Sequence, residues 1–166
     1  MKSNIIFIGM PASGKSTVGV VVAKRLGYEF VDTDLLIQKQ ENRLLKEIIA
    51  DVGNEGFLEI ENQVNRDVKA EKAVISPGGS IVYCQEAMEH YKEIGEIVYL
   101  KVSYETINNR ISNAKNRGVV LKEGQTLHDL YMERTMLFEK YADYIVSEEG
   151  LELEETIDKV LELFEK

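Results

Sequence analysis

The sequence predicts an α/β fold in which a five-stranded parallel sheet is flanked by helices. Five short apolar segments of strand length alternate with longer segments whose apolar residues recur every three or four positions. Such alternation is typical of a parallel sheet covered by helices on both faces. The spacing leaves the order of the strands open. The expected strands cover residues 4–9, 28–32, 73–77, 96–102 and 144–147.

The first and last helices show the helical period most clearly. Each has apolar residues three and four positions apart, which form one stripe along the helix and predict that this stripe faces the sheet. The stripes consist of Val18, Val22 and Leu26 after the first strand, and of Ile157, Val160, Leu161 and Phe164 near the end of the chain.

The size and charge of the chain limit what it can be. Its 166 residues suffice for one domain with a buried core, so we expect a single domain over residues 1–166. Lys and Arg number 20 against 29 Asp and Glu, giving a net charge of −9. A chain this acidic repels nucleic acid and anionic membranes, so any site for an anion must be local. We therefore expect neither nucleic acid nor membrane as a partner.

The location and assembly of the chain are also constrained. Cys84 is the only cysteine, which excludes an internal disulfide and suits a reducing compartment. The first residues carry too short an apolar run for a signal peptide, and no segment approaches the roughly 18 apolar residues of a membrane span. We expect a cytoplasmic protein that is a monomer, with a weak dimer as the alternative.

The segment GMPASGKS, residues 9–16, joins the first expected strand to the first expected helix. It fits the P-loop pattern Gly-x-x-x-x-Gly-Lys-Ser/Thr in its required context. Gly9 and Gly14 allow successive backbone N–H groups to turn around a phosphate, and the helix directs its positive end at the same anion. Lys15 is suited to the outer phosphates and Ser16 to Mg²⁺. The sequence therefore predicts a nucleotide site that uses ATP and Mg²⁺.

Several classes of nucleotide-binding protein are disfavoured. A GTPase would need a guanine-recognising Asn-Lys-x-Asp segment, which is missing, and residues 51–56 (DVGNEG) match a switch motif only loosely. A motor ATPase would need a larger domain. A small nucleotide-dependent transferase is the most economical interpretation.

Two carboxylates follow the second expected strand. Asp32 and Asp34 would lie at the carboxyl edge of the sheet, where α/β proteins bind ligands. In an extended segment, side chains two residues apart face the same way. One carboxylate could then organise Mg²⁺ while the other accepts a hydroxyl proton. The alternative is that they cap the helix that follows.

Arg134 falls in the middle of an apolar stripe. At about 100° per residue, a helix over this segment places it between apolar residues on one face. A guanidinium there must find an anion, because an unpaired buried charge is very costly. An internal carboxylate and a carboxylate or phosphate of the substrate are equally consistent with the pattern. The stripe consists of Leu127, Leu130, Leu137, Phe138 and Tyr141.

Residues 110–122 form a basic segment in an acidic chain. It contains Arg110, Lys115, Arg117 and Lys122 and no acidic residue, with Gly118 inside it and Gly124 just after it. This composition suits a mobile lid, over about residues 112–124, that closes on phosphates and excludes water. The alternative is a solvated loop.

Taken together, these motifs resemble the shikimate kinase family of P-loop kinases along nearly the whole chain. The similar segments are GMPASGKST (9–17), DTD (32–34), GFLEIE (56–61), SPGGS (76–80), RGVVL (117–121) and ERTMLF (133–138). The resemblance implies a five-stranded P-loop NTPase fold of the nucleoside-monophosphate-kinase type with a lid over ATP.

The resemblance also implies roles for individual residues. Catalysis would fall to Lys15, Asp34 and Arg117, and Mg²⁺ to Ser16 and Asp32. ATP would be bound by Gly9, Ala12, Ser13, Gly14, Lys15, Ser16 and Thr17, with Arg110 along the adenine. The acceptor would be bound at Asp34, Leu58, Glu61, Gly78, Gly79 and Arg134, with Arg134 on its carboxylate.

The chain departs from the family pattern near the acceptor. Leu58 replaces an arginine that normally shares the substrate carboxylate, Ser80 replaces a third glycine, Arg117 is followed by Gly-Val-Val, and Met136 replaces a proline. Leu58 lies about 100° off the core stripe of its helix, so we expect it to face a cleft, solvent or a partner. Losing one charge-assisted contact costs about 1.5–3 kcal/mol, or about 10- to 150-fold in affinity.

The function we predict is transfer of the γ-phosphoryl group of ATP to a hydroxyl of shikimate or a related small hydroxy acid. An alternative acceptor is a hydroxy-amino acid, because Glu61 lies one turn from Leu58, lacks the cationic neighbour and could receive an amine. A nucleotide-binding regulatory module without turnover is an alternative of another class.

Overall fold

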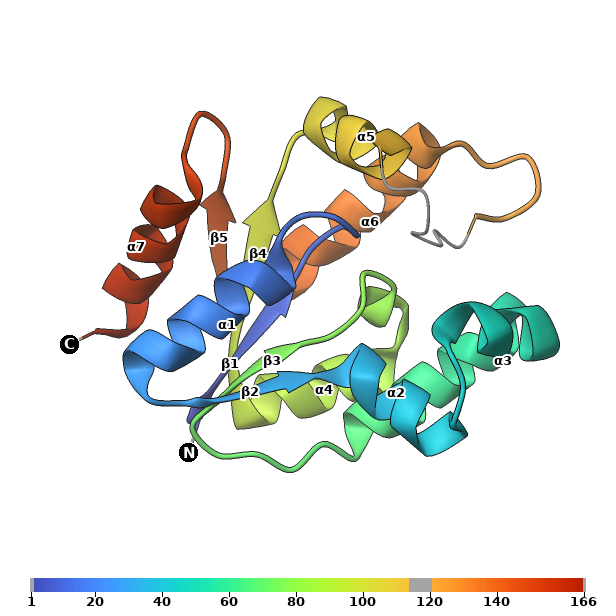
Figure 1. Cartoon of the computed structure of the whole chain (residues 1–166), viewed down its shortest axis with the longest axis horizontal. Helices are drawn as coiled ribbons and strands as arrows, with labels where there is room; N and C mark the ends of the chain where they lie inside the picture. Colours follow the sequence, from blue (N-terminus) through green and yellow to red (C-terminus); the bar gives the residue numbers. More distant parts are fainter. Residues whose placement is uncertain (1, 114–120, 166) are drawn as a thin grey trace.

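The five strands form one parallel sheet in the order β2-β3-β1-β4-β5 (Figure 1). This arrangement comes from a computed structural model that describes residues 2–113 and 121–165. Each strand lies within one residue of its predicted bounds, so the predicted fold class is confirmed. The strands are β1 (Asn4–Ile8), β2 (Glu29–Asp32), β3 (Ala73–Ser76), β4 (Gly95–Lys101) and β5 (Tyr144–Ser147).

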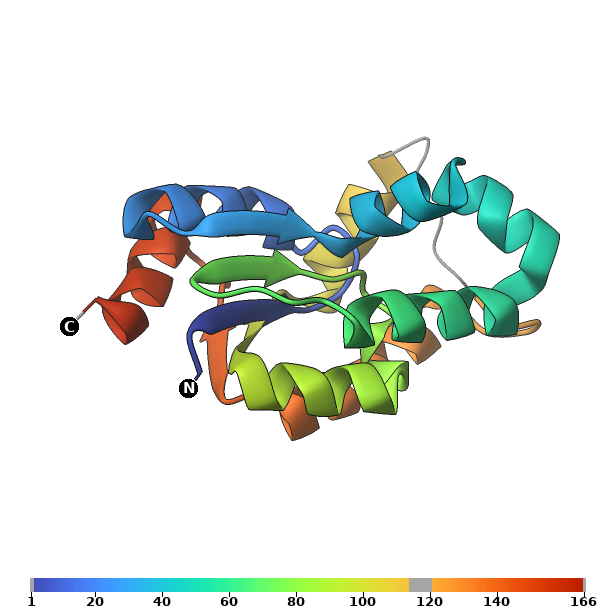
Figure 2. The same cartoon turned by 90° about the horizontal axis from the view of Figure 1, so that it is seen from below.

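Helices cover both faces of this sheet (Figure 2). Helices α1 (Lys15–Leu26) and α7 (Leu153–Phe164) pack on one face, and α4 (Gln85–Ile94) and α6 (Leu127–Tyr141) on the other. Alternation along β1 divides the core between them: Ile5 and Phe7 join the cluster with α1 and α7, and Ile6 joins the cluster with α4 and α6. The apolar stripes predicted for the first and last helices therefore do face the sheet.

A helical pair extends from the carboxyl edge of the sheet. Helix α2 (Thr33–Glu41) starts directly after β2, and α3 (Leu45–Arg66) packs against it through a small cluster of Ile37, Ile48 and Phe57 (Figure 1). At Gly53 the backbone of α3 leaves the helical conformation, with φ 74° and ψ 178°. The helix predicted around residues 54–70 is the second part of α3.

Two short helices complete the architecture. They are the 3₁₀ helix η1 (Ile81–Tyr83), after β3, and α5 (Tyr104–Asn113), after β4. Among the helices of the described residues, none is long and apolar enough to cross a membrane.

Candidate active site

The loop between β1 and α1 is shaped for an anion. A Cβ at Gly9 would lie 2.9 Å from the carbonyl oxygen of Leu100, and Gly14, with φ 89°, caps the N-terminus of α1. Lys15 is buried, and its Nζ donates hydrogen bonds to the carbonyl oxygens of Gly9 and Met10, both at 2.9 Å. The loop glycines, the helix N-terminus and the ammonium group therefore converge as a phosphate site requires.

Asp32 and Asp34 start helix α2. Asp32 Oδ1 accepts hydrogen bonds from the backbone N–H groups of Asp34 (3.0 Å) and Leu35 (3.3 Å), so the capping alternative holds for Asp32. The chain has already turned helical at Asp34, so the prediction from an extended segment was wrong about the local backbone. Both carboxylates nevertheless line the same cavity.

The described residues fit a magnesium ion that is bound together with phosphate. The hydroxyl oxygens of Ser16 and Ser76 lie 3.4 Å apart, and both residues line the cavity with Asp32. Within residues 2–113 and 121–165, no group of three or more His, Cys, Asp or Glu side chains is arranged so that it could hold a metal ion by itself. Because Mg²⁺ commonly takes one or two protein ligands, with waters and phosphate oxygens for the rest, this sparse set suffices.

The cavity that Asp32 and Asp34 line has a volume of about 590 Å³. It lies between the P-loop, α2, α3, the β3–η1 loop and α6, and we call it the larger cavity because a second one, of about 310 Å³, lies beside the P-loop. It adjoins residues far apart in the sequence that were predicted to bind phosphates or the acceptor. They are Lys15, Asp34, Glu61, Gly78, Gly79 and Arg134.

The β3–η1 loop passes close to charged side chains. A Cβ at Gly78 would lie 2.9 Å from Asp34 Oδ1 and 3.0 Å from Glu61 Oε2. A Cβ at Gly79 would lie 2.6 Å from Cδ of Pro11 and 3.1 Å from Nη1 of Arg134. Gly79 therefore leaves no room for a side chain, and a side chain at Gly78 would have to displace carboxylate oxygens. The loop backbone borders two carboxylates and one guanidinium.

Arg134 is only 3% exposed, as its place in the apolar stripe predicted. Its guanidinium carbon lies 5.4 Å from the centre of the Tyr83 ring, and its Nε has no hydrogen-bond partner among the residues that the structure describes. In the part of the chain that the structure describes, no carboxylate forms an ion pair with it within 4 Å. The internal carboxylate considered as a direct partner is not found there, and a substrate anion stays the predicted one.

Two cavity carboxyls have raised pKa values. Burial, with a smaller effect from Asp32, raises the pKa of Asp34 to about 6 against the opposing influence of Lys15. Burial likewise raises the pKa of Glu61 to about 7, although Ser80 Oγ donates a 2.6 Å hydrogen bond to its Oε1. A carboxylate with a pKa near 6 is mostly ionised at neutral pH and can accept a proton from a hydroxyl group.

Leu58 does not line the cavity. Its side chain is half-buried and packs against the core cluster that includes α4, and its carbonyl oxygen accepts a hydrogen bond from Cys84 Sγ at 3.6 Å. The expectation that Leu58 lies off the core was wrong, because α3 packs against α2 on one side and against α4 and η1 on another.

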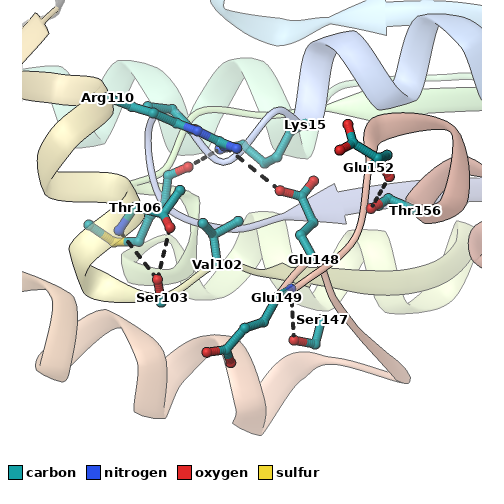
Figure 3. Close-up of polar contacts among 12 residues, drawn as sticks. Lys15, Val102, Ser103, Thr106, Arg110, Ser147, Glu148, Glu149, Glu152 and Thr156 are labelled. Carbon is teal, nitrogen blue, oxygen red and sulfur yellow. Dashed lines mark hydrogen bonds and ion pairs between the residues drawn. The ribbon is translucent and has the colours of Figure 1, made fainter.

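A second cavity, of about 310 Å³, lies beside the P-loop (Figure 3). Arg110 Nη1 donates a 2.8 Å hydrogen bond to the carbonyl oxygen of Ala12 and lies 3.7 Å from Glu148 Oε2. Gly14 and Thr17 line both cavities, so the P-loop connects them. This position beside the P-loop suits the nucleoside part of a nucleotide. Arg117 and the lid residues 114–120 lie outside the described residues.

The sequence of the chain matches known proteins over nearly its full length. Residues 11–165 match the family model for shikimate kinase. A shikimate kinase from Thermodesulfovibrio yellowstonii is 34% identical over 166 residues, which cover 98% of this chain and 95% of that protein. One from Clostridium botulinum strain 657 is 38% identical over 141 residues, covering 82% and 83%. The chain belongs to the shikimate kinase family.

Solved structures of shikimate kinases have the same fold. The enzyme from Acinetobacter baumannii in complex with shikimate superimposes with a TM-score of 0.89 at 29% identity, covering 98% of this chain and 93% of that one. The enzyme from Aquifex aeolicus gives 0.83 at 30% identity, covering 98% and 96%. A gluconokinase from Sinorhizobium meliloti, at 16% identity and a TM-score of 0.60, shares the fold alone.

Several cavity residues of this shikimate kinase family member were not predicted. Gln38, Lys46 and Ile49 reach the larger cavity because α2 and the first part of α3 form one wall of it. Glu148 and Leu151 reach the smaller cavity from the loop after β5. The loop after β5 could have been suspected, because all parallel strands end at the same edge of the sheet. No sequence pattern pointed to the α2–α3 wall.

Proposed function

We propose that this chain transfers the γ-phosphoryl group of ATP to a hydroxyl of shikimate or a closely related small hydroxy acid. The observation that carries the proposal is the buried guanidinium of Arg134, which lines the same cavity as Lys15 and Asp34. A cavity lined by both a P-loop lysine and a buried arginine suits an acceptor that carries a hydroxyl for the phosphoryl group and a carboxylate for the arginine. The shikimate bound by the related A. baumannii enzyme has both groups and supports this choice.

Different residues of the chain would bind the phosphates, the acceptor and Mg²⁺. The P-loop N–H groups and Lys15 would hold the phosphates, and Arg134 would orient the acceptor through its carboxylate. Asp34 would orient the hydroxyl and accept its proton. Ser16 and Asp32 would hold Mg²⁺, which neutralises charge on the phosphates when bound. Members of the family use ATP and Mg²⁺, and catalysis here would be mostly positioning and charge neutralisation.

The test is ADP release from ATP and Mg²⁺ with and without shikimate. We expect shikimate-dependent release, and Arg134→Met should raise the KM for shikimate by about 10- to 150-fold, the effect of losing a charge-assisted contact. The matched control is Arg25→Met, an exposed arginine on α1 that pairs with Asp158. ADP release that is unaffected by shikimate at any concentration overturns the proposal.

The assembly of the protein stays a prediction. We propose a monomer, with a weak dimer as the alternative, and sedimentation at micromolar concentration distinguishes the two. Burial of Leu58 against the core leaves it less suited to the intermolecular contact that its sequence position had suggested.

A further inference from the structure

Glu61 is a buried carboxyl group with one oxygen that no described residue uses. Its side chain is 0% exposed, and Oε1 accepts hydrogen bonds from Ser80 Oγ at 2.6 Å and Cys84 Sγ at 3.8 Å. Its Oε2 accepts no hydrogen bond from residues 2–113 and 121–165, although the residue lines the larger cavity. Because burying an unsatisfied carboxylate is costly, this oxygen is suited to a donor on a ligand.

The described part of the chain supplies no cation directly to Glu61. No lysine, arginine or histidine there forms an ion pair with it within 4 Å. Leu58, one turn earlier, is apolar and packs on the core. Arg134 lowers the pKa of Glu61 through its charge, without forming an ion pair with it within 4 Å. Lys46 lines the same cavity, but its side chain is exposed. Among the described residues, Oε2 is therefore left for a cation of the ligand.

The opposite charge lies one residue along the β3–η1 loop. A Cβ at Gly78 would meet Glu61 Oε2 at 3.0 Å, and a Cβ at Gly79 would meet Arg134 Nη1 at 3.1 Å. Consecutive Cα atoms are about 3.8 Å apart, so neighbouring residues of this loop border the anionic and the cationic group. An α-amino acid carries an ammonium and a carboxylate on one carbon, so a single small ligand presents a partner for each of these two groups.

We propose that this cavity accepts α-amino acids with a side-chain hydroxyl, with the ammonium on Glu61 and the carboxylate on Arg134. The proposal rests on the proposed phosphoryl transfer and extends it to zwitterionic acceptors. The bond from the γ-phosphorus to the bridging oxygen breaks, and its electron pair leaves with ADP. The acceptor oxygen forms the new bond to phosphorus, and its proton passes to Asp34 and then to water.

Matched acceptors that differ only in the amine test the proposal. ADP release with ATP and Mg²⁺ is measured for L-homoserine against 4-hydroxybutanoate and for L-serine against 3-hydroxypropanoate, with shikimate alongside. We expect kcat/KM for at least one amino acid to exceed that of its partner by about 10- to 150-fold, the effect of one charge-assisted contact.

Variants of Glu61 show whether its charge causes the preference. Glu61→Gln keeps an acceptor for Ser80 but loses the charge, so the ratio should fall to near one. Glu61→Asp keeps the charge and should retain part of the ratio, which separates loss of charge from loss of folding. Glu59→Gln, exposed on the same helix, is the matched control and should leave the ratio unchanged.

The outcomes distinguish this proposal from the proposed function. Turnover of shikimate with no preference for either amino acid overturns the zwitterion proposal and leaves the proposed function intact. If no acceptor is turned over, the proposed function fails. Calorimetric binding of the same pairs, in the presence of a non-hydrolysable ATP analogue, then decides the zwitterion proposal: equal or absent binding of amino acid and partner overturns it, and Glu61-dependent preference supports it.

Discussion

The buried carboxyl of Glu61 should give this protein a pH-dependent stability that one substitution removes. Burial raises its pKa from 4.5 to about 7; Asp34 adds to the rise, whereas Ser80 and Arg134 oppose it. Because the folded pKa lies above the unfolded one, the stabilisation is complete below pH 4.5 and is lost as the pH rises through about 7. At about 1.4 kcal/mol per unit of pKa difference, the loss is about 3 kcal/mol.

Urea unfolding of Glu61→Gln and the parent protein from pH 4 to pH 8 measures this loss. The glutamine can accept the hydrogen bond from Ser80 but cannot ionise. The free energy of unfolding of the variant should therefore rise relative to that of the parent by about 3 kcal/mol across the range. Glu59→Gln, which is exposed, should show a difference from the parent that does not vary with pH.

Other groups near Glu61 do not account for such a change. Burial raises the pKa of Cys84 and of Tyr91, so both stay neutral through this range. Asp34 titrates in both proteins, and its charge raises the pKa of Glu61, so the coupling between the two carboxyls is part of the predicted difference. A difference between Glu61→Gln and the parent that is constant, or that shrinks as the pH rises, refutes the reasoning.

Three further substitutions have defined outcomes. Gly79→Ala places a methyl group 2.6 Å from Cδ of Pro11, so the free energy of unfolding measured in urea should fall by about 1–3 kcal/mol. An unchanged free energy of unfolding would mean that the loop moves to accommodate the methyl group at no cost. Glu148→Gln removes a negative charge beside the N-terminus of α1, so the KM for ATP should fall, by less at high salt; a rise would contradict this. Leu58→Arg places a cation one turn from Glu61, so any preference for amino acids over hydroxy acids should shrink; an unchanged preference would contradict the pairing.

Local patterns in the sequence predicted the parts of the fold that depend on local physics. The five strands and the P-loop around Lys15 follow from β-forming runs, glycines and helical periodicity. The burial of Arg134 follows from the same periodicity, because a residue in the middle of an apolar stripe must face the core. These features depend on residues close together in the sequence.

Features that depend on distant contacts could not be predicted in this way. Strand order depends on how the crossovers pack, and Leu58 is half-buried because a second element lies against α3. Asp34 lies in the first turn of α2, whereas the prediction had assumed an extended backbone from Asp32 to Asp34. The hydrogen bond from Ser80 to Glu61 joins residues on two elements, so no spacing rule could have found it.

The most direct test of the central claim follows the phosphoryl group itself. Phosphorus NMR of ATP, Mg²⁺ and shikimate with the protein should show a new phosphate-ester resonance that grows as ADP appears. Asp34→Asn should slow its growth by about 100-fold or more, because the group that accepts the hydroxyl proton is lost. ADP and free phosphate without an ester, or equal ester formation by Asp34→Asn, would contradict the account.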